Sequence, residues 1–382
     1  MRIALLMKTY SLSRGGGEYD LVRLSASLAD RGHEVHLFVN KIEGERDPRL
    51  TFHPVPMNNL WAPLKIRSFA RNAPRAVAES GVEFDVIHSM TQCFPSDLYW
   101  NGGGLQINWI PARYGVGALD RAWLNPRHAA NLWVERKIFE PGNYRQVVCL
   151  TQMEKETILD NYGVPEERLH VIPNGIDPAR FNLHVNNRFR EEVRKDLGLQ
   201  ADQTMLLFVG TDGVRKGLPQ LLSALGRLSP KFEGLLVIAG NDPPERWAGE
   251  VRDNGLESSI RFHGREPMIE RLYAAADLVM MPSVFEGYGN VIPEAMACGR
   301  PVFTTRWVGA SDFVTEGENG WVISSCEAME EYVERLAFAL HQANLPMMGL
   351  QAAEAVRTFT WDWTVTELEK VYQLIVEEKR RS

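Results

Sequence analysis

The alternation of short apolar runs with helix-patterned segments is the feature that most restricts the fold of this chain. Runs such as RIALLM and EVHLFVN near the N-terminus are separated by a segment whose leucines recur at helical spacing. Short apolar runs are typical of buried strands, and helical segments between them indicate crossover connections, which join parallel strands. The sequence therefore predicts an α/β protein with parallel sheets.

The alternation occurs twice, which predicts two α/β domains. With 382 residues, the chain is long enough for two domains of about 100–200 residues each. The expected strands of the two series lie at 2–7, 34–40, 84–89 and 146–151, and then at 205–210, 235–240, 277–283 and 301–305. The Pro and Gly residues of VIPNGID (171–177) suit a linker. We expect an N-terminal domain at 1–173, a C-terminal domain at 174–359 and an amphipathic helix at 360–382 that crosses back to the N-terminal domain.

The composition argues against several classes of protein. The net charge of −7 is not typical of a nucleic-acid-binding protein. The cysteines are scattered without a CxxC pair, which indicates a reducing compartment and no structural zinc; they are Cys93, Cys149, Cys298 and Cys326. The N-terminal apolar run, closed by Lys8, is too short for a signal peptide. No run approaches the ~18 apolar residues of a membrane span.

A glycine-rich bend with a carboxylate on each side follows the expected strand 277–283. Glycine permits unusual backbone geometry in FEGYGNVIPEAMACGRPV (285–302), and Pro293 suits a first helical turn. A helix starting near 290–292 would point free N–H groups at a diphosphate. Glu286 and Glu294 could then accept hydrogen bonds from hydroxyls at either end of it. Alternatively, Glu294 only complements the helix dipole and Glu286 is solvated.

Basic residues follow the strand 205–210. Arg215 and Lys216 of VGTDGVRKG precede a glycine and a helix. Fixed cations there could stabilise the charge of a departing nucleoside diphosphate. The alternative is a solvated basic pair. The loop is not a P-loop, and because GxGxxG is absent after the first strand, we do not expect a nicotinamide site.

These motifs, in this order, resemble the family 4 retaining glycosyltransferases, which have the GT-B fold: two doubly wound Rossmann-like domains facing across a cleft. The resemblance rests on GGGE (15–18), LADRGHEVHLF, FDVIHS, VIPNGIDPARF, FVGTDGVRKGLPQLLSAL and the region HGREPMIERLYAAADLVMMPSVFEGYGNVIPEAMACGRPV. It covers most of the chain. The loops around GTDGVRKG and RWVGASDFVTEGENGWVI look most like the lipopolysaccharide core glucosyltransferase I subfamily.

The resemblance implies the following site. The catalytic residues would be Arg215, Lys216, Glu286 and His88. The donor would be bound by Gly15, Gly16, Gly264, Arg265, Gly287, Tyr288, Gly289, Asn290, Val291 and Glu294. The family often carries H-x-H at His88, but Met90 stands here in place of the second histidine, and His88 could instead be a strand-end residue satisfied by its neighbours. Asp97 and Asn101 are close enough in sequence to offer acceptor contacts.

The implied reaction moves a hexose, expected to be glucose, from a nucleotide diphosphate sugar, expected to be a UDP-sugar, to a hydroxyl of a cell-envelope glycan or glycolipid such as lipopolysaccharide core. No cofactor is expected, and no metal, because the sequence has no DxD acidic pair. The rival interpretations are a nucleotide-sugar 2-epimerase of the same fold and a non-catalytic nucleotide-sugar-binding protein.

Segment 107–139 interleaves tryptophans with basic residues, namely Trp109, Trp123 and Trp133 with Arg113, Arg121, Arg127, Arg136 and Lys137. This composition suits a membrane surface, where Trp lies among headgroups and cations meet anionic lipid. The alternative is a segment that packs against the core of the domain and exposes a charged outer face. We expect a cytoplasmic protein, with possible contact at the inner face of the cytoplasmic membrane.

Overall fold

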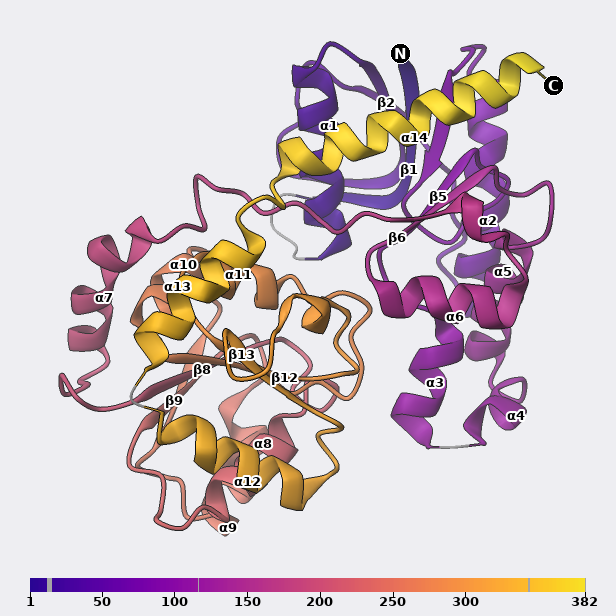
Figure 1. The fold of residues 1–382 in the computed structure, drawn as a ribbon. Coiled ribbons are helices and arrows are strands. Elements are labelled where there is room, and N and C mark those ends of the chain that lie inside the picture. The colour runs from indigo at the N-terminus through magenta and orange to yellow at the C-terminus, as the bar shows by residue number, and fades with distance from the viewer. Residues whose placement is uncertain (12–15, 116, 343, 382) are drawn as a thin grey trace. The chain divides into compact units, whose positions relative to one another are not determined.

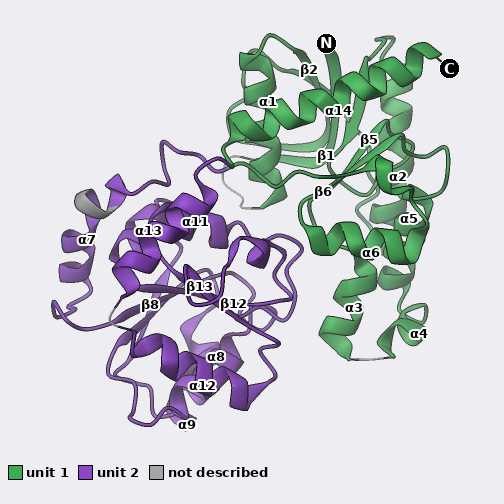
Figure 2. Ribbon diagram, in the orientation of Figure 1, with its two compact units in different colours: residues 1–175, 359–382 green, residues 176–358 purple. Residues whose placement is uncertain are grey.

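The chain forms two compact units in the computed structural model, which describes residues 1–11, 16–115, 117–342 and 344–381 (Figure 1). The first unit contains residues 1–175 and 359–382, and the second contains residues 176–358 (Figure 2). The C-terminal segment therefore belongs to the unit that the N-terminus begins.

Within its described residues, the first unit is built on a seven-stranded sheet in the order β3-β2-β1-β4-β5-β6-β7, and every paired strand is parallel. The strands are β1 (Arg2–Ser11), β2 (Glu34–Glu43), β3 (Thr51–Pro54), β4 (Val86–Ser89), β5 (Leu98–Asn101), β6 (Gln146–Cys149) and β7 (Leu169–Val171). The central strand β1 is apolar over Ile3–Leu6 because helices cover both of its faces.

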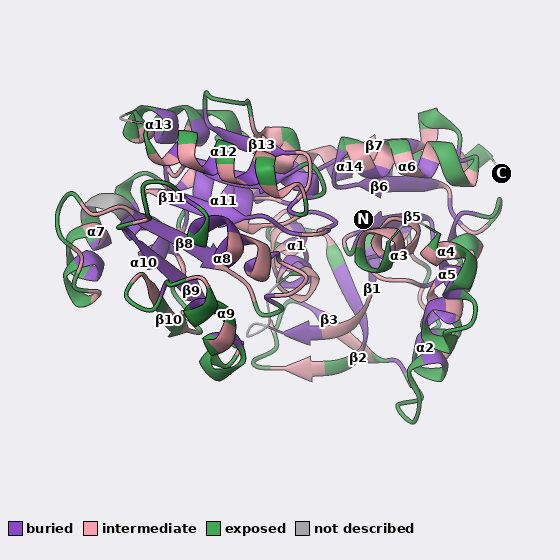
Figure 3. Ribbon diagram, turned by 90° about the horizontal axis from the view of Figure 1, so that it is seen from below, coloured by how far each residue is buried: buried purple, intermediate pink, exposed green. Residues whose placement is uncertain are grey.

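The helices of this unit are α1 (Gly17–Asp30), α2 (Ala62–Glu79), α3 (Gln106–Tyr114), α4 (Ala118–Ala122), α5 (Pro126–Ile138), α6 (Gln152–Tyr162) and α14 (Trp361–Arg381), with a 3-10 turn at Glu166–Arg168. Helices α2, α5 and α6 share one apolar core with Ala4 and Leu6 of β1. Helices α1 and α14 lie side by side, and α14 also contacts β4 (Figure 1). Strands of the sheet such as β5 and β6 are buried throughout, whereas the helices of this unit also have exposed residues (Figure 3).

Polar contacts attach α14 to the rest of the first unit. The guanidinium of Arg31 donates to Glu369 at 2.6 Å and to the Asp362 carboxylate at 2.5 Å. The Thr364 hydroxyl donates to the carbonyl of Pro173 at 3.1 Å. These contacts place the last helix of the chain on the N-terminal sheet.

The second unit, within its described residues, has a six-stranded parallel sheet in the order β10-β9-β8-β11-β12-β13. The strands are β8 (Met205–Val209), β9 (Leu235–Ala239), β10 (Ile260–Gly264), β11 (Leu278–Met281), β12 (Val302–Thr305) and β13 (Gly320–Ile323). The chain winds outward from β8 to β10 and then from β11 to β13. The order therefore reverses between β8 and β11, which is where ligands bind in such sheets.

The helices of the second unit are α7 (His184–Asp196), α8 (Leu218–Gly226), α9 (Ala248–Asp253), α10 (Glu270–Ala275), α11 (Val291–Ala297), α12 (Met329–Leu340) and α13 (Leu345–Val356), with 3-10 turns at Pro244–Trp247 and Gly309–Phe313. Helices α8, α9 and α12 share one large core with the sheet. Helix α10 packs on α7, and α11 packs on α13. Strands β8 and β11 are consequently buried.

We predict that Gly175→Ala destabilises the first unit. A Cβ at this position would lie 2.4 Å from the Cα and the backbone N of Trp361, where α14 begins. Overpacking against backbone should lower the free energy of unfolding by about 1–3 kcal/mol, measured by urea denaturation. Gly103→Ala is the control, because no atom lies within 4 Å of the added carbon. Equal effects of the two substitutions would contradict the assigned packing.

Candidate active site in the second unit

The loop after β8 and the loop after β11 meet where the strand order reverses. Gly217 closes the first loop with φ of 78°, and a Cβ there would lie 2.0 Å from the carbonyl oxygen of Pro282. Only glycine fits this position, both in conformation and in space. The amide of Val284 donates to the carbonyl of Arg215 at 2.9 Å. The two loops are therefore joined backbone to backbone.

This junction brings two cations onto one carboxylate. Glu286 Oε2 lies 2.5 Å from Arg215 Nη1 and 2.9 Å from Lys216 Nζ. Burial alone would raise the pKa of Glu286, but the charges of Lys216 and Arg215 outweigh it and hold that pKa below its ordinary value. Glu286 is therefore ionised at neutral pH, and the three groups keep a net positive charge.

The bend between the two glutamates is fixed by the segment after β12. The amide of Glu286 donates to the carbonyl of Trp307 at 2.9 Å. The amide of Ala310 donates to the carbonyl of Tyr288 at 2.8 Å. Gly289 has φ of 95°, and a Cβ there would lie 2.9 Å from the side chains of Met281 and Val308. Helix α11 begins at Val291 after Asn290, within the range that the sequence predicts. Gly287, which follows Glu286 in this bend, is buried.

Glu294 has the opposite electrostatic environment from Glu286. It lies in the first turn of α11 and accepts a hydrogen bond from the hydroxyl of Tyr273 at 3.0 Å. Burial raises its pKa to about 7, against the smaller opposing effects of Tyr273 and Arg180. Glu294 therefore carries a proton over much of the acidic range, whereas Glu286 does not.

A small cavity of about 190 Å³ opens beside the first loop, at the carboxyl ends of β8, β9 and β10. Gly264 and His263 line it from β10 and Asp242 lines it from the loop after β9. The Asp242 carboxylate accepts the amide of Gly213 at 2.8 Å, which ties this loop to the first. Arg265, next to Gly264, is exposed. Gly264, which is predicted to meet the nucleotide base, thus lines a cavity beside the loop that carries Arg215 and Lys216.

The structure buries His88 in the first unit. Its ring is fully inaccessible, lies 5.5 Å from the Trp100 ring in a stacked arrangement, and forms a 2.8 Å hydrogen bond through Nδ1 to the hydroxyl of Tyr372 in α14. Burial lowers its pKa to about 3, so the ring is neutral. These contacts fit the alternative of a strand-end residue held by its neighbours only in part, because Nε2 is buried and has no hydrogen-bond partner among the described residues. A catalytic role for His88 stays an untested prediction.

Both predicted acceptor contacts have structural partners. Asp97 precedes β5 and so lies at the amino edge of the sheet, where it accepts the Ile87 amide at 2.8 Å and pairs with Lys379 at 2.7 Å. Acceptors are expected at the opposite, carboxyl edge. Asn101 does end β5 at that edge, but it is buried and donates to Glu154 at 3.1 Å. A role for Asp97 or Asn101 in acceptor binding stays an untested prediction.

Of the glycines after β1, Gly16 is the residue before α1, with φ of 69°, and its carbonyl accepts the Asp20 amide at 3.1 Å. Gly15 lies outside the described residues.

Two residues near the predicted sites were missed from the sequence. Tyr273, the partner of Glu294, is buried in α10 and carries no motif signal. Lys8 is half-buried at the carboxyl end of β1, and no hydrogen bond or ion pair joins its ammonium to the described residues; burial lowers its pKa. The available signal was Lys8 itself, a charge that directly follows the apolar run of β1.

Segment 107–139 forms α3, α4 and α5, apart from residue 116, which is not described. Trp123 and Trp133 are 44% and 37% exposed, whereas Trp109 is half-buried against His128. Arg136 lies over the Trp123 ring at 5.0 Å, and Arg67 of α2 lies over the Trp133 ring at 5.2 Å. No described helix is long and apolar enough to span a bilayer.

No described cluster of three or more His, Cys, Asp or Glu side chains is arranged to hold a metal ion.

Comparison with known families agrees with this fold. A family described as Glycosyltransferase Family 4 matches residues 14–180, and one described as Glycosyl transferases group 1 matches residues 203–341. The chain belongs to these family 4, group 1 glycosyltransferases, and its two parallel-sheet units are those of the GT-B fold.

Among its relatives is the lipopolysaccharide glucosyltransferase WaaG of Escherichia coli (strain K12), which is 28% identical over 345 residues, 89% of this chain and 90% of that protein. A D-inositol 3-phosphate glycosyltransferase of Corynebacterium glutamicum (strain R) is 26% identical over an alignment of 416 positions, which covers 97% of this chain and 96% of that protein. The crystal structure of WaaG, a glycosyltransferase involved in lipopolysaccharide biosynthesis, matches with a TM-score of 0.82 at 25% identity, covering 98% of this chain and 99% of that one. Anabaena HepE in complex with UDP-glucose shares the fold at a TM-score of 0.69 and 20% identity, with 100% of both chains covered.

We predict that Glu294→Gln changes how stability depends on pH. Between the ordinary pKa of 4.5 and about 7, the folded protein holds a proton on Glu294 that the unfolded chain has lost, so stability falls as the pH rises. In the variant this contribution is absent. Its unfolding free energy relative to the wild type should therefore increase from pH 5 to pH 8 in denaturation series. Glu257→Gln, at an exposed glutamate, is the control; a parallel course for both variants would refute the assignment.

Proposed function

We propose that this glycosyltransferase moves a hexose from a nucleotide diphosphate sugar with retention of configuration and without a metal ion. The observation that supports this most is the pair Arg215 and Lys216 on the single carboxylate of Glu286. Two cations at the carboxyl edge of a parallel sheet, beside a helix N-terminus, can take up the charge that develops on a departing diphosphate. The same task falls to a divalent ion in other transferases.

Each predicted donor residue has a role in this proposal. Arg215 and Lys216 neutralise the diphosphate, and the backbone of the bend and of α11 donates to it; that stretch includes Gly287, Tyr288, Gly289, Asn290 and Val291. Glu286 accepts hydrogen bonds from the hydroxyls of the transferred sugar, and Glu294 accepts those of the ribose. Gly264 and Arg265 lie along the base. Gly15 and Gly16 of the first unit complete the predicted donor set.

Retention follows from the proposed role of the leaving group. The departing phosphate oxygen takes the proton of the acceptor hydroxyl on the same face of the sugar, so the new bond forms where the old one broke. Because two cations hold the Glu286 carboxylate, it is suited to orient hydroxyls rather than to attack the sugar. The enzyme supplies position and charge stabilisation.

The donor that we propose is UDP-glucose and the acceptor is a cell-envelope glycan or glycolipid such as lipopolysaccharide core. Support comes from the names of the related proteins, a lipopolysaccharide glucosyltransferase and a fold relative crystallised with UDP-glucose. We propose a cytoplasmic setting, in keeping with four buried cysteines that form no disulfide. Contact with the inner face of the membrane would bring α3–α5 to a lipid-linked acceptor.

Arg215→Ala and Lys216→Ala should each lower kcat by about 10²–10³-fold, because each removes one group that stabilises the developing charge. The measurement is nucleoside diphosphate release from a panel of donors, with and without cell-envelope glycolipid. Release by the wild type should rise with glycolipid and should be unchanged by EDTA.

Arg252→Ala, at an exposed arginine of α9, is the control and should keep wild-type turnover. Unfolding midpoints of all variants should stay close together; a collapse of folding in the Arg215 and Lys216 variants would make these residues structural. Donor turnover at the same rate with and without acceptor would favour the 2-epimerase. Binding of the donor without turnover would favour a non-catalytic protein.

Membrane contact has a separate test. Replacing Arg113, Arg121 and Arg127 by Gln should weaken binding to vesicles of anionic phospholipid at low salt by on the order of 100-fold, since each cation near such a surface contributes about 1 kcal/mol. The matched control replaces Arg227, Lys231 and Arg252, which are exposed on the second unit and remove the same charge. Equal binding by the two triple variants would end this part of the proposal.

A further inference from the structure

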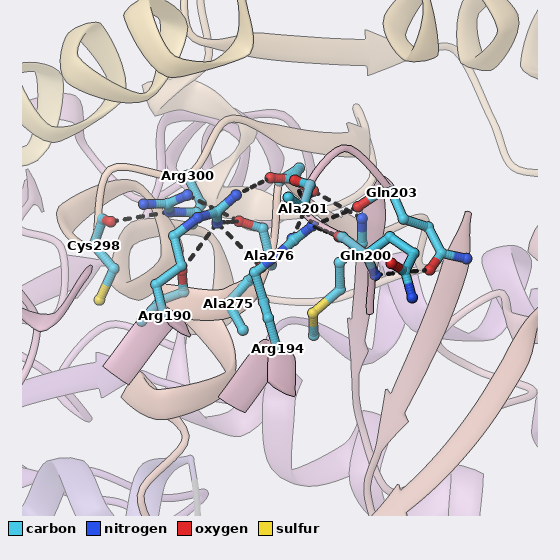
Figure 4. Close-up of polar contacts among 12 residues, drawn as sticks. Arg190, Arg194, Gln200, Ala201, Gln203, Ala275, Ala276, Cys298 and Arg300 are labelled. Carbon is cyan, nitrogen blue, oxygen red and sulfur yellow. Dashed lines mark hydrogen bonds and ion pairs between the residues drawn. The ribbon is translucent and has the colours of Figure 1, made fainter. Parts of the chain in front are cut away.

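A second cationic cluster lies at the opposite edge of the second sheet from the donor loops. Asp277 comes just before β11 and Arg300 just before β12, so both lie at the amino ends of parallel strands. Arg190 and Arg194 reach the same place from α7, and the close-up shows the three guanidinium groups converging there (Figure 4). This cluster takes no part in the proposed transfer.

One carboxylate and a group of carbonyls face these three arginines. Asp277 pairs with Arg190 at 2.5 Å and with Arg194 at 3.1 Å. Arg190 Nη1 also donates to the carbonyls that end α10, at 2.9–3.1 Å. Three guanidinium charges against one carboxylate leave the cluster with excess positive charge.

Arg300 is the least satisfied of the three. Its Nε donates to the Cys298 carbonyl at 3.2 Å and its Nη1 to the Ala276 carbonyl at 2.9 Å. Its Nη2 has no hydrogen bond to any described residue. Burial, and then the charge of Arg190, lower the pKa of Arg300 to about 10. An added anion would both occupy the open donors and offset the excess charge.

Arg190, Arg300 and their carboxylate partner Asp277 line a cavity of about 320 Å³ that also has an apolar wall. The wall is formed by Leu183, Leu345, Pro346 and Leu350. Leu183 and Leu350 are 40% and 52% exposed. The volume is within the range of small-molecule sites. The cavity thus combines a cationic end with a partly solvent-exposed aliphatic side.

Close packing joins two sides of this cavity. Gly299 belongs to its lining, and a Cβ on Gly349 of α13 would lie 2.1 Å from the Gly299 carbonyl oxygen. Helix α13, which carries the aliphatic wall, therefore rests directly on the turn that carries Arg300. A site whose cationic and apolar parts are held by backbone contact needs little ordering when a ligand binds.

We propose that this cavity binds a small amphiphilic anion, a phosphate monoester on a short aliphatic body. The phosphate contacts the free Nη2 of Arg300 and the guanidinium of Arg190, and the aliphatic part lies along Leu183, Leu345 and Leu350. Guanidinium groups match phosphate geometry, and the leucines remove the aliphatic part from water. The ligand could be a soluble ester or the headgroup region of an anionic lipid, and neither depends on the proposed transfer reaction.

The test is calorimetric titration of the full chain with hexyl phosphate, inorganic phosphate and hexanol. Hexyl phosphate should bind with a Kd below about 1 mM, and each of the other two probes at least about tenfold more weakly, because each engages only one part of the site. Arg300→Gln should weaken hexyl phosphate binding about tenfold or more. Leu350→Ser should weaken hexyl phosphate binding about three- to tenfold. Because this substitution alters only an exposed side chain, it keeps the proposal testable if Arg300→Gln fails to fold.

Two controls separate this site from others. Arg215→Ala, which alters the proposed diphosphate contacts, should leave the hexyl phosphate affinity unchanged, as should Arg252→Gln on α9. Vesicles with and without phosphatidate, assayed with wild type and Arg300→Gln, distinguish a lipid source from a soluble ester. The proposal is overturned if hexyl phosphate does not bind, if Leu350→Ser binds it as tightly as the wild type does, or if Arg215→Ala abolishes the binding.

Discussion

The sharing of one carboxylate, Glu286, by Arg215 and Lys216 is the interaction on which the candidate site depends. It forms only because the loop after β8 and the loop after β11 touch at the level of the backbone. Gly217 permits that contact, since any side chain there would overlap the Pro282 carbonyl. The geometry of the cations is therefore set by close packing at the reversal of strand order, and charge is concentrated where helix N-termini and strand ends also favour an anion.

Two glutamates eight positions apart on this scaffold have opposite protonation behaviour. Glu286 lies against two cations and keeps its charge despite burial, whereas Glu294 faces the Tyr273 hydroxyl and has a pKa of about 7. Glu286 is therefore an acceptor that is charged at neutral pH, whereas the charge of Glu294 changes near neutral pH. The distinction suits the proposed division between the transferred sugar and the ribose, because the two polyols would meet carboxylates of different strength.

The amino edges of both sheets serve the fold through a repeated device. Asp97 accepts the backbone amide of Ile87, and Asp277 accepts that of Met205, each bridging to the start of a neighbouring strand. Both carboxylates are in turn held by cations, Lys379 of α14 in the first unit and Arg190 and Arg194 of α7 in the second. Structural charge is thus placed at the amino edges and the proposed chemistry at the carboxyl edges. The second amino edge carries one arginine more than the first pattern needs, Arg300, which donates to the carbonyls of Cys298 and Ala276.

The sequence by itself determined the parallel α/β architecture, the two series of strands and the two loops that carry Arg215, Lys216, Glu286 and Glu294, because periodicity and glycine placement are local properties of the chain. Only the tertiary structure decided the environments. His88 is sealed beneath Tyr372, a residue 284 positions away, and Asp97 is drawn to Lys379 at the amino edge. The protonation of Glu294 likewise depends on Tyr273 of another helix and on burial by several elements. Desolvation and long-range pairing are sums over residues distant in sequence, so no local pattern could reveal them.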